Sequence, residues 1–186
     1  MYDIKQDRLV STPPVPISEF IAKNLKSELN VLPFSDFFGE NVSLVPVPKS
    51  SLMTPGSLWV PLRIVQAFCR HGLGKELNCL IRTKPVPKAA SSRPEDRPRA
   101  IDHYQSIEVQ TNMTSPVNII LVDDVITRGA TLLGAASRLH EAFPDATIRA
   151  FAVLRTISNP DEFNKIFLPV KGSITLDPGG QTRRSP

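Results

Sequence analysis

The stretch Asn118-Ile-Ile-Leu-Val-Asp-Asp-Val-Ile-Thr-Arg-Gly-Ala-Thr131, with the helical run that follows it to Phe143, predicts the fold of this chain. Residues 118–122 are apolar and rich in β-branched side chains, a pattern typical of a strand buried on both faces of a parallel sheet. An acidic pair, a loop of small and hydroxyl-bearing residues, and apolar residues at helical spacing come next. The order is therefore strand, acidic pair, loop and helix.

The loop from Thr127 to Thr131 has the residue types that bind a phosphate group. Gly129 permits a positive φ, so successive N–H groups can point at an anion beside the positive end of the helix. The two threonines can add hydroxyl donors. Asp123 and Asp124 are poor partners for phosphate and good acceptors for sugar hydroxyls, so the pattern predicts a ligand with both groups, such as a ribose 5-phosphate.

Residues 119–131 resemble the signature of the type I phosphoribosyltransferases, which bind phosphoribosyl pyrophosphate (PRPP). The resemblance implies an α/β fold with a central, mostly parallel sheet, helices on both faces and a small hood. It implies that Asp123 and Asp124 hold the ribose 2′- and 3′-hydroxyls and act in catalysis. It also implies that the 5′-phosphate lies against Thr127, Arg128, Gly129, Ala130 and Thr131.

One position departs from part of this family. Members that act on 6-oxopurines carry an Asp where this chain has Thr127. The resemblance therefore argues against hypoxanthine or guanine as the substrate, and it leaves the nucleophile open between a nucleobase and an amine.

Two other protein classes place acids after an apolar strand. A receiver domain would have the pair near its first strand and need more chain than follows Asp123, and no G-x-x-x-x-G-K-[ST] motif is present for a P-loop. A buried strand that ends in a solvated loop, without any function, is the remaining alternative.

A second loop is expected after residues 42–48, which form a strand that prolines bring to an end. The resemblance implies that the pyrophosphate loop lies here, with Lys49 neutralising the leaving pyrophosphate and Ser50 and Ser51 donating hydrogen bonds. Residues 45–48, Val-Pro-Val-Pro, are also similar to the opening of ComF-like phosphoribosyltransferases, a group linked to DNA uptake. A solvated basic turn is the alternative.

Two predicted strands, 77–82 and 106–109, enclose a long segment without periodicity, and such a segment in a compact domain is usually functional or disordered. In this family a flexible loop in that place closes over the reaction centre and brings a basic residue to the pyrophosphate. Lys88 and Arg93 are our choices for this catalytic role, since cationic donors in a water-poor site stabilise the departing charge. A solvated run of charge is the alternative.

At 186 residues and 20.5 kDa, the chain fits one domain. We expect residues 1–35 to form an N-terminal arm and helix that could serve as the hood, residues 36–171 the phosphoribosyltransferase core, and residues 172–186 a last strand and a mobile basic tail. Within these ranges the periodicity predicts a helix from residue 17 to 29, a helix ending near His71, a strand over 148–154 and a short helix over 161–167.

Cys69 and Cys79 are the two cysteines, with no C-x-x-C motif, so we expect no zinc site and a reducing compartment. The sequence has no apolar run of 18 residues and starts unlike a signal peptide. These features predict a cytoplasmic protein without membrane contact.

The family implies a Mg²⁺-dependent transfer of the phosphoribosyl group to a nitrogen nucleophile with release of pyrophosphate. Mg²⁺ binds phosphate oxygens and keeps water ligands, so no dedicated set of protein ligands need be visible. A non-catalytic PRPP-binding regulatory or accessory protein, ComF-like or repressor-like, is the alternative. The net charge of +4, with few aromatic residues among the basic ones, favours phosphate handling over nucleic acid. A homo-oligomer is compatible with the sequence.

Overall fold

The computed structural model describes residues 2–87, 93, 96–110, 115–157 and 168–185. Lys88 and the predicted helix over residues 161–167 lie outside these ranges. In chain order the elements are α1 Tyr2–Lys5, β1 Leu9–Val10, β2 Val15–Pro16, α2 Ile17–Glu28, η1 Leu29–Val31, η2 Ser35–Phe37, β3 Val42–Pro46, α3 Val60–Arg70, β4 Lys75–Glu76, β5 Leu80–Arg82, α4 Ala100–Gln105, β6 Ile107–Val109, β7 Asn118–Ile126, α5 Ala130–Ala142, β8 Thr147–Arg155, β9 Ser173–Leu176 and β10 Thr182–Ser185.

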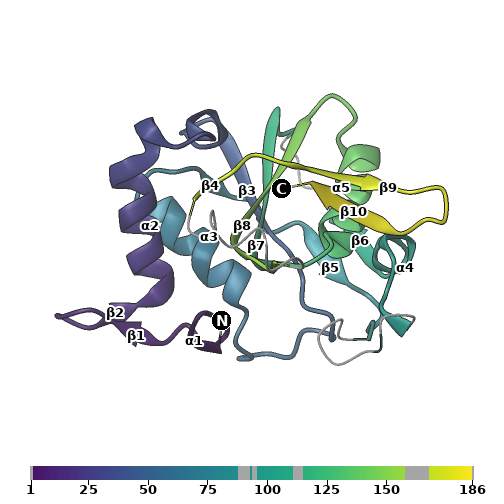
Figure 1. The fold of residues 1–186 in the computed structure, drawn as a ribbon, viewed down its shortest axis with the longest axis horizontal. Coiled ribbons are helices and arrows are strands. Elements are labelled where there is room, and N and C mark those ends of the chain that lie inside the picture. The colour runs from purple at the N-terminus through teal and green to yellow at the C-terminus, as the bar shows by residue number, and fades with distance from the viewer. Residues whose placement is uncertain (1, 88–92, 94–95, 111–114, 158–167, 186) are drawn as a thin grey trace.

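A four-stranded parallel sheet with strand order β4-β3-β7-β8 forms the centre of the molecule (Figure 1). Strand β7 pairs with β3 on one side and β8 on the other, so that Val122 lies opposite Pro46 and Phe151. Its residues 119–122 are at most 2% exposed. The prediction of a strand buried on both faces is confirmed, and so is the α/β fold with a central parallel sheet.

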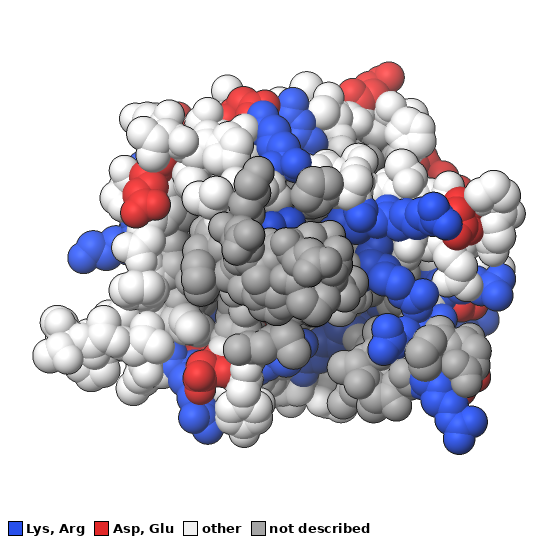
Figure 2. All heavy atoms as spheres, in the orientation of Figure 1, with Lys and Arg blue, Asp and Glu red and all other residues white. Residues whose placement is uncertain are grey.

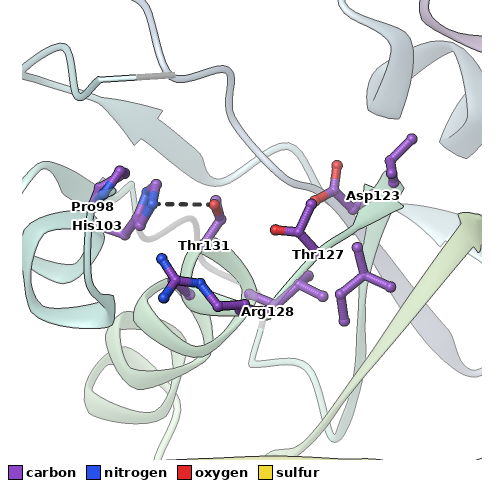
Figure 3. Close-up of a pocket in the computed structure, with 11 residues that line it drawn as sticks. Pro98, His103, Asp123, Thr127, Arg128 and Thr131 are labelled. Atoms are coloured by element: carbon purple, nitrogen blue, oxygen red, sulfur yellow. Dashed lines mark hydrogen bonds between the residues drawn. The ribbon is translucent and has the colours of Figure 1, made fainter. Parts of the chain in front are cut away.

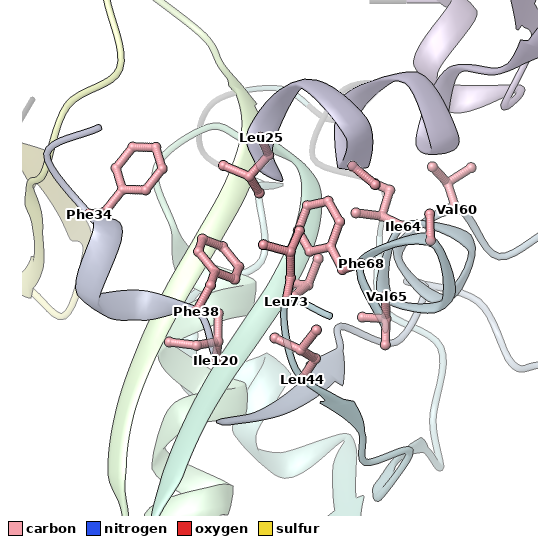
Figure 4. Close-up of a cluster of buried hydrophobic side chains, with 13 residues drawn as sticks. Leu25, Phe34, Phe38, Leu44, Val60, Ile64, Val65, Phe68, Leu73 and Ile120 are labelled. Atoms are coloured by element: carbon pink, nitrogen blue, oxygen red, sulfur yellow. The ribbon is translucent and has the colours of Figure 1, made fainter. Parts of the chain in front are cut away.

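Helices α2 and α3 cover one face of this sheet (Figure 1). The even-numbered residues of β7, Ile120 and Val122, point into the cluster between these helices and the sheet. Four phenylalanines pack together here, with contacting ring centroids 5.2–6.5 Å apart and steep ring angles. Figure 4 shows Phe34, Phe38 and Phe68 among the buried side chains of the cluster. Such edge contacts stabilise the core beyond the burial of apolar area alone. The rings belong to Phe34, Phe38, Phe68 and Phe151.

Helix α5 covers the other face (Figure 1). The odd-numbered residues of β7, Ile119 and Leu121, point to this side and pack with Leu132 and Leu139 of the helix. Side chains of a strand alternate between the two faces of its sheet, so consecutive residues of β7 contribute to the apolar clusters on both faces.

Strands β5 and β6 form a separate antiparallel pair on the α5 side, with Leu80 opposite Val109 and Arg82 opposite Ile107. The two strands that the sequence predicts around the long loop are therefore present. They pair with each other in the described structure and lie outside the four-stranded sheet. Helix α4 follows the loop and packs on α5.

The N-terminal segment contains α1 and the short β1–β2 hairpin, where the sequence predicts an extended arm. The predicted helix that follows it is confirmed as α2. None of the helices within the described ranges is both long enough and apolar enough to cross a membrane.

The C-terminal segment also differs from its expectation. Residues 182–185, predicted as part of a mobile tail, form β10 and pair with β9. The Pro-Gly-Gly sequence that indicated mobility makes the turn of this hairpin, in which Asp177 Oδ1 accepts hydrogen bonds from the N–H groups of Gly179 and Gln181. Asp and Gly favour tight turns for this reason. The boundaries of the three predicted chain divisions stay predictions.

Candidate functional site

A pocket lies where β7 passes into α5, at the carboxyl end of the central sheet (Figure 3). Ligands of open α/β sheets bind at this end of the strands. Residues 125–132 and Asp123 form one wall, and Pro98 and His103 form the other. The cavity volume of the pocket is about 40 Å³, and the empty space comes to about 380 Å³ when the open mouth is included.

Gly129 shapes the loop at the bottom of this pocket. Its φ is +86°, in the left-handed region, and it is the N-cap of α5. Glycine adopts this conformation without the steric cost that other residues incur. The first N–H groups of an α-helix have no intrahelical acceptor, and Ala130, Thr131 and Leu132 line the pocket. The positive end of α5 therefore faces the pocket.

The two acids of the signature point to opposite faces of the sheet. Asp123 continues the odd-numbered series of β7 on the α5 side and lines the pocket. Asp124 continues the even-numbered series, and its Oδ2 lies 3.4 Å from Nζ of Lys5 in α1. The described pocket thus contains one of the two predicted acids, and the other is paired with the N-terminal segment.

Burial raises the pKa of Asp123 well above its usual range, and the neighbouring carboxylate of Asp124 raises it further. Oδ1 of Asp123 accepts a hydrogen bond of 2.9 Å from the N–H of Asp124, which partly offsets these effects. A cation or a hydroxyl donor that enters the pocket would stabilise the charged form of this carboxyl group and lower its pKa.

The residues predicted for the pyrophosphate loop follow β3, and they do not line the pocket. The N–H of Val47 donates to the carbonyl of Val122, which keeps the chain beside β7 as it leaves the sheet. Trp59 Nε1 donates to the carbonyl of Val47. Lys49 Nζ donates to Ser57 Oγ over 3.0 Å, and the carbonyl of Ser50 accepts a hydrogen bond from the N–H of Val86.

Ser51 is exposed in the same turn, and Arg93 is exposed in the long loop. Arg93 accepts a hydrogen bond at its carbonyl from the N–H of Asp96 and does not line the pocket. Lys88, the other residue predicted for this catalytic role, lies outside the described residues. The described part of the long loop reaches the pocket through Pro98.

The structure also brings buried polar residues to the pocket that the sequence analysis did not select. Arg82, His103 and Ser106 are at most 4% exposed and bonded to one another, and His103 lines the pocket beside Thr131. The sequence does contain a signal for each of the first two. Arg82 shares its face of β5 with buried Leu80, and His103 lies one helical turn after buried Ala100.

The C-terminal hairpin packs against the outside of the loop. A Cβ at position 129 would lie 2.7 Å from Cδ1 of Ile174 in β9. Arg184 of β10 donates to the carbonyls of Ile126 and Thr156, and Arg128 Nη1 donates to Gln181 Oε1 over 3.3 Å. Lys and Arg side chains gather over this hairpin (Figure 2), so the region beside the pocket attracts anions.

The described residues contain no group of three or more His, Cys, Asp or Glu side chains that could hold a metal ion by themselves. Among the described residues that line the pocket, Asp123 alone offers a carboxylate. This arrangement fits an ion such as Mg²⁺, which keeps water ligands and binds through one or two carboxylates together with phosphate oxygens of a substrate.

No protein-family model matches this chain, and no curated protein matches its sequence. Among solved structures, it is similar to a hypoxanthine phosphoribosyltransferase from Staphylococcus aureus in a tetragonal crystal form, with a TM-score of 0.42 and 11% identity over 77% of this chain and 64% of that one. An orthorhombic form of the same enzyme gives a TM-score of 0.39 and 12% identity over 76% of this chain and 68% of the other. The chain thus matches less than two thirds of the length of the first of these structures.

Proposed function

We propose that this protein binds PRPP and transfers its phosphoribosyl group to a nitrogen nucleophile with release of pyrophosphate. One observation carries the proposal. A half-buried acid with a raised pKa, Asp123, and the positive start of α5 line the same pocket, which suits a ligand with a hydroxyl-bearing sugar and a phosphate.

In this proposal the 5′-phosphate lies against residues 127–131 and accepts hydrogen bonds from their N–H groups and from the hydroxyls of Thr127 and Thr131. Asp123 accepts a hydrogen bond from a ribose hydroxyl. For Asp124 to serve the second hydroxyl, its pair with Lys5 would have to open and its side chain would have to turn towards the pocket.

Asp123 would also hold Mg²⁺, directly or through a water ligand. When bound, the ion would neutralise charge on the pyrophosphate group. The remaining contacts with the pyrophosphate would come from side chains of the protein. Lys49, Ser50 and Ser51 would bind the pyrophosphate from the turn after β3, and Lys88 or Arg93 would approach it from the long loop and exclude water.

Titration calorimetry with PRPP and MgCl₂ tests the proposal. We expect Asp123→Asn to weaken PRPP binding at least about tenfold, because it removes the carboxyl group that would accept from the ribose hydroxyl and hold Mg²⁺. Asp145→Asn is the matched control, since Asp145 is exposed in the turn before β8, at the other end of the sheet. Equal affinity in the wild type and Asp123→Asn, or no binding to the wild type, would reject the proposal.

Pyrophosphate release across a panel of nucleobases and amines then defines the nucleophile. We expect no release with hypoxanthine or guanine, because Thr127 offers no carboxylate at the place where the 6-oxopurine enzymes carry one. Release with either base at a rate comparable to any other acceptor would contradict this part of the proposal.

A second candidate function is a PRPP-binding regulatory protein without transferase activity. The pair between Lys5 and Asp124 favours it, because an acid held by the chain itself is not available to the sugar. Such a protein would bind PRPP and release no pyrophosphate with any acceptor. If the basic C-terminal hairpin in addition binds nucleic acid, that affinity will fall steeply with salt and will not respond to Asp123→Asn.

A further inference from the structure

A buried arginine connects the two loops on either side of the pocket. Arg82 is 3% exposed, and three of its nitrogen atoms donate hydrogen bonds. Nε donates to the carbonyl of Lys49 over 2.8 Å, Nη1 to Ser106 Oγ over 2.6 Å, and Nη2 to His103 Nδ1 over 3.3 Å. None of the ion pairs in the described part of the chain involves Arg82.

The contact with Arg82 fixes the proton on the ring of His103. A guanidinium group only donates hydrogen bonds, so Nδ1 must accept and cannot carry a hydrogen. The neutral ring then has its hydrogen on Nε2, which lies 3.2 Å from Oγ1 of Thr131. Burial, followed by the charge of Arg82, lowers the pKa of His103 to about 4, so the ring is neutral at pH 7.

This tautomer determines what the hydroxyl of Thr131 can do. Because Nε2–H donates to Oγ1, the hydroxyl hydrogen of Thr131 is left to donate elsewhere, and Thr131 lines the pocket (Figure 3). A donor is the group that an anion needs. With the opposite tautomer the hydroxyl would donate to the ring and present only lone pairs to the pocket.

We propose that Arg82 and His103 are positioning residues, which hold the hydroxyl of Thr131 as a hydrogen-bond donor to a phosphate group in the pocket and tie its orientation to the turn at Lys49. The inference rests on the proposed phosphate ligand and names residues that determine its affinity. Neither side chain needs to touch the ligand for this role.

The cost of this arrangement supports a role beyond packing. Burying a guanidinium group without a carboxylate partner is unfavourable, and the neighbouring cluster is apolar. The chain of hydrogen bonds also depends on an unusually close approach of α4 to α5. A Cβ at Gly134 would lie 2.6 Å from the carbonyl of Ala100 and 2.7 Å from Cβ of His103, so the glycine is what admits α4 to this position.

The first test is the tautomer itself, read from the ¹⁵N shifts and ring couplings of His103 in the wild-type protein at pH 7. We expect a protonated Nε2 and an unprotonated Nδ1. A proton on Nδ1 would overturn the inference, whatever ligand the pocket binds.

The second test is a double-mutant cycle on the affinity for ribose 5-phosphate. We expect Thr131→Val to weaken binding about tenfold, since it removes a hydrogen bond to a charged group. His103→Leu should weaken binding severalfold in the wild type and have no further effect in the Thr131→Val background. His103→Gln, whose amide can still donate to Thr131, should recover most of the loss, and Thr131→Ser, which keeps the hydroxyl, should lose less affinity than Thr131→Val.

The outcomes separate this inference from the proposed function. If the wild type does not bind ribose 5-phosphate, both are rejected. If it binds and the two substitutions act additively, or His103→Gln is as weak as His103→Leu, only the inference is rejected. Thermal unfolding of each variant shows whether it still folds. If His103→Leu is unstable, the comparison rests on Thr131→Val, which changes a half-buried position.

Discussion

On the α2–α3 face of the sheet, four phenylalanine rings pack edge to face, whereas the α5 face combines an apolar cluster with buried Arg82, His103 and Ser106. Apolar contacts are nondirectional and stabilise the fold in proportion to the area buried. Buried hydrogen bonds add less net stability, but they hold each donor in one orientation. The first face therefore supports the sheet, and the second orients the groups that line the pocket.

The two adjacent acids of β7 also divide between the two faces of the sheet. Asp123 belongs to the α5 side and reaches the pocket, and Asp124 belongs to the α2–α3 side and pairs with Lys5. Two adjacent residues of one strand thus have different surroundings because side chains alternate along β7.

The largest expected effect comes from the apolar face. Phe68→Ala removes a side chain that is 0% exposed, and we expect the free energy of unfolding to fall by about 3–5 kcal/mol in urea denaturation. Phe20→Ala, at a position of α2 that is 42% exposed, is the control and should cost less than about 1 kcal/mol. A small loss for Phe68→Ala would show that the rings do not support the sheet as described.

The polar face should respond to pH instead. The pKa of His103 lies at about 4 in the folded protein, against an ordinary value of 6.5, so the unfolded chain binds a proton more readily. Protonation of the unfolded chain therefore lowers the free energy of unfolding as the pH falls from 6.5 towards 4, by up to roughly 3 kcal/mol. Above pH 6.5 the ring is neutral in both states and this loss is absent.

His103→Gln removes this titration, so its free energy of unfolding should fall less between pH 7 and pH 4 than that of the wild type. Denaturation curves at several pH values measure the difference. His140→Gln, which removes an exposed imidazole of α5, controls for the loss of a histidine elsewhere. Parallel curves for wild type and His103→Gln would contradict the buried neutral ring.

The loop between the two faces should be sensitive to backbone strain. Gly129→Ala places a side chain at a φ of +86° and against Ile174, whereas Gly56→Ala, at a φ of +73°, meets nothing within 4 Å. We expect Gly56→Ala to cost about 1–2 kcal/mol from strain alone and Gly129→Ala to cost more. Thermal unfolding ranks the two, and adding Ile174→Ala should recover part of the difference. Equal losses would mean that the hairpin does not press on the loop.

The smallest effect is expected at the link between the N-terminal segment and Asp124. Lys5→Ala breaks an ion pair whose lysine side chain is 49% exposed, so the loss of stability should stay below about 1 kcal/mol and shrink in high salt. Urea denaturation at low and high ionic strength measures it. A larger, salt-independent loss would show that α1 is held mainly by this pair.

Local patterns in the sequence predicted the central part of the fold. Strand β7 was recognised from its continuous apolar run, and helices α2, α3 and α5 were recognised from apolar residues at helical spacing. The prolines after β3 marked its end, and the loop at Gly129 was expected from residue types that favour a positive φ. Each of these features is decided within a few residues along the chain.

Features that depend on distant contacts were not predicted. The pairing of β10 with β9 depends on a turn whose glycines indicated mobility, and the pair between Lys5 and Asp124 joins residues far apart in sequence. The buried network was missed because arginine is usually solvent-exposed and histidine is of intermediate burial, and the alternation that turns Arg82 inward covers a strand of only three residues. The role of each residue of the pocket stays a prediction.

The contact between Ile174 and Gly129 separates two reasons for keeping a glycine in this loop. A methyl group at position 129 would lie against Ile174 of the hairpin, so the absent side chain makes room for another part of the protein itself. The packing of the hairpin therefore requires a glycine at the start of α5 whether or not the pocket binds a ligand. Divergence at Ile174, more than at Gly129, would reveal when that constraint had been relaxed.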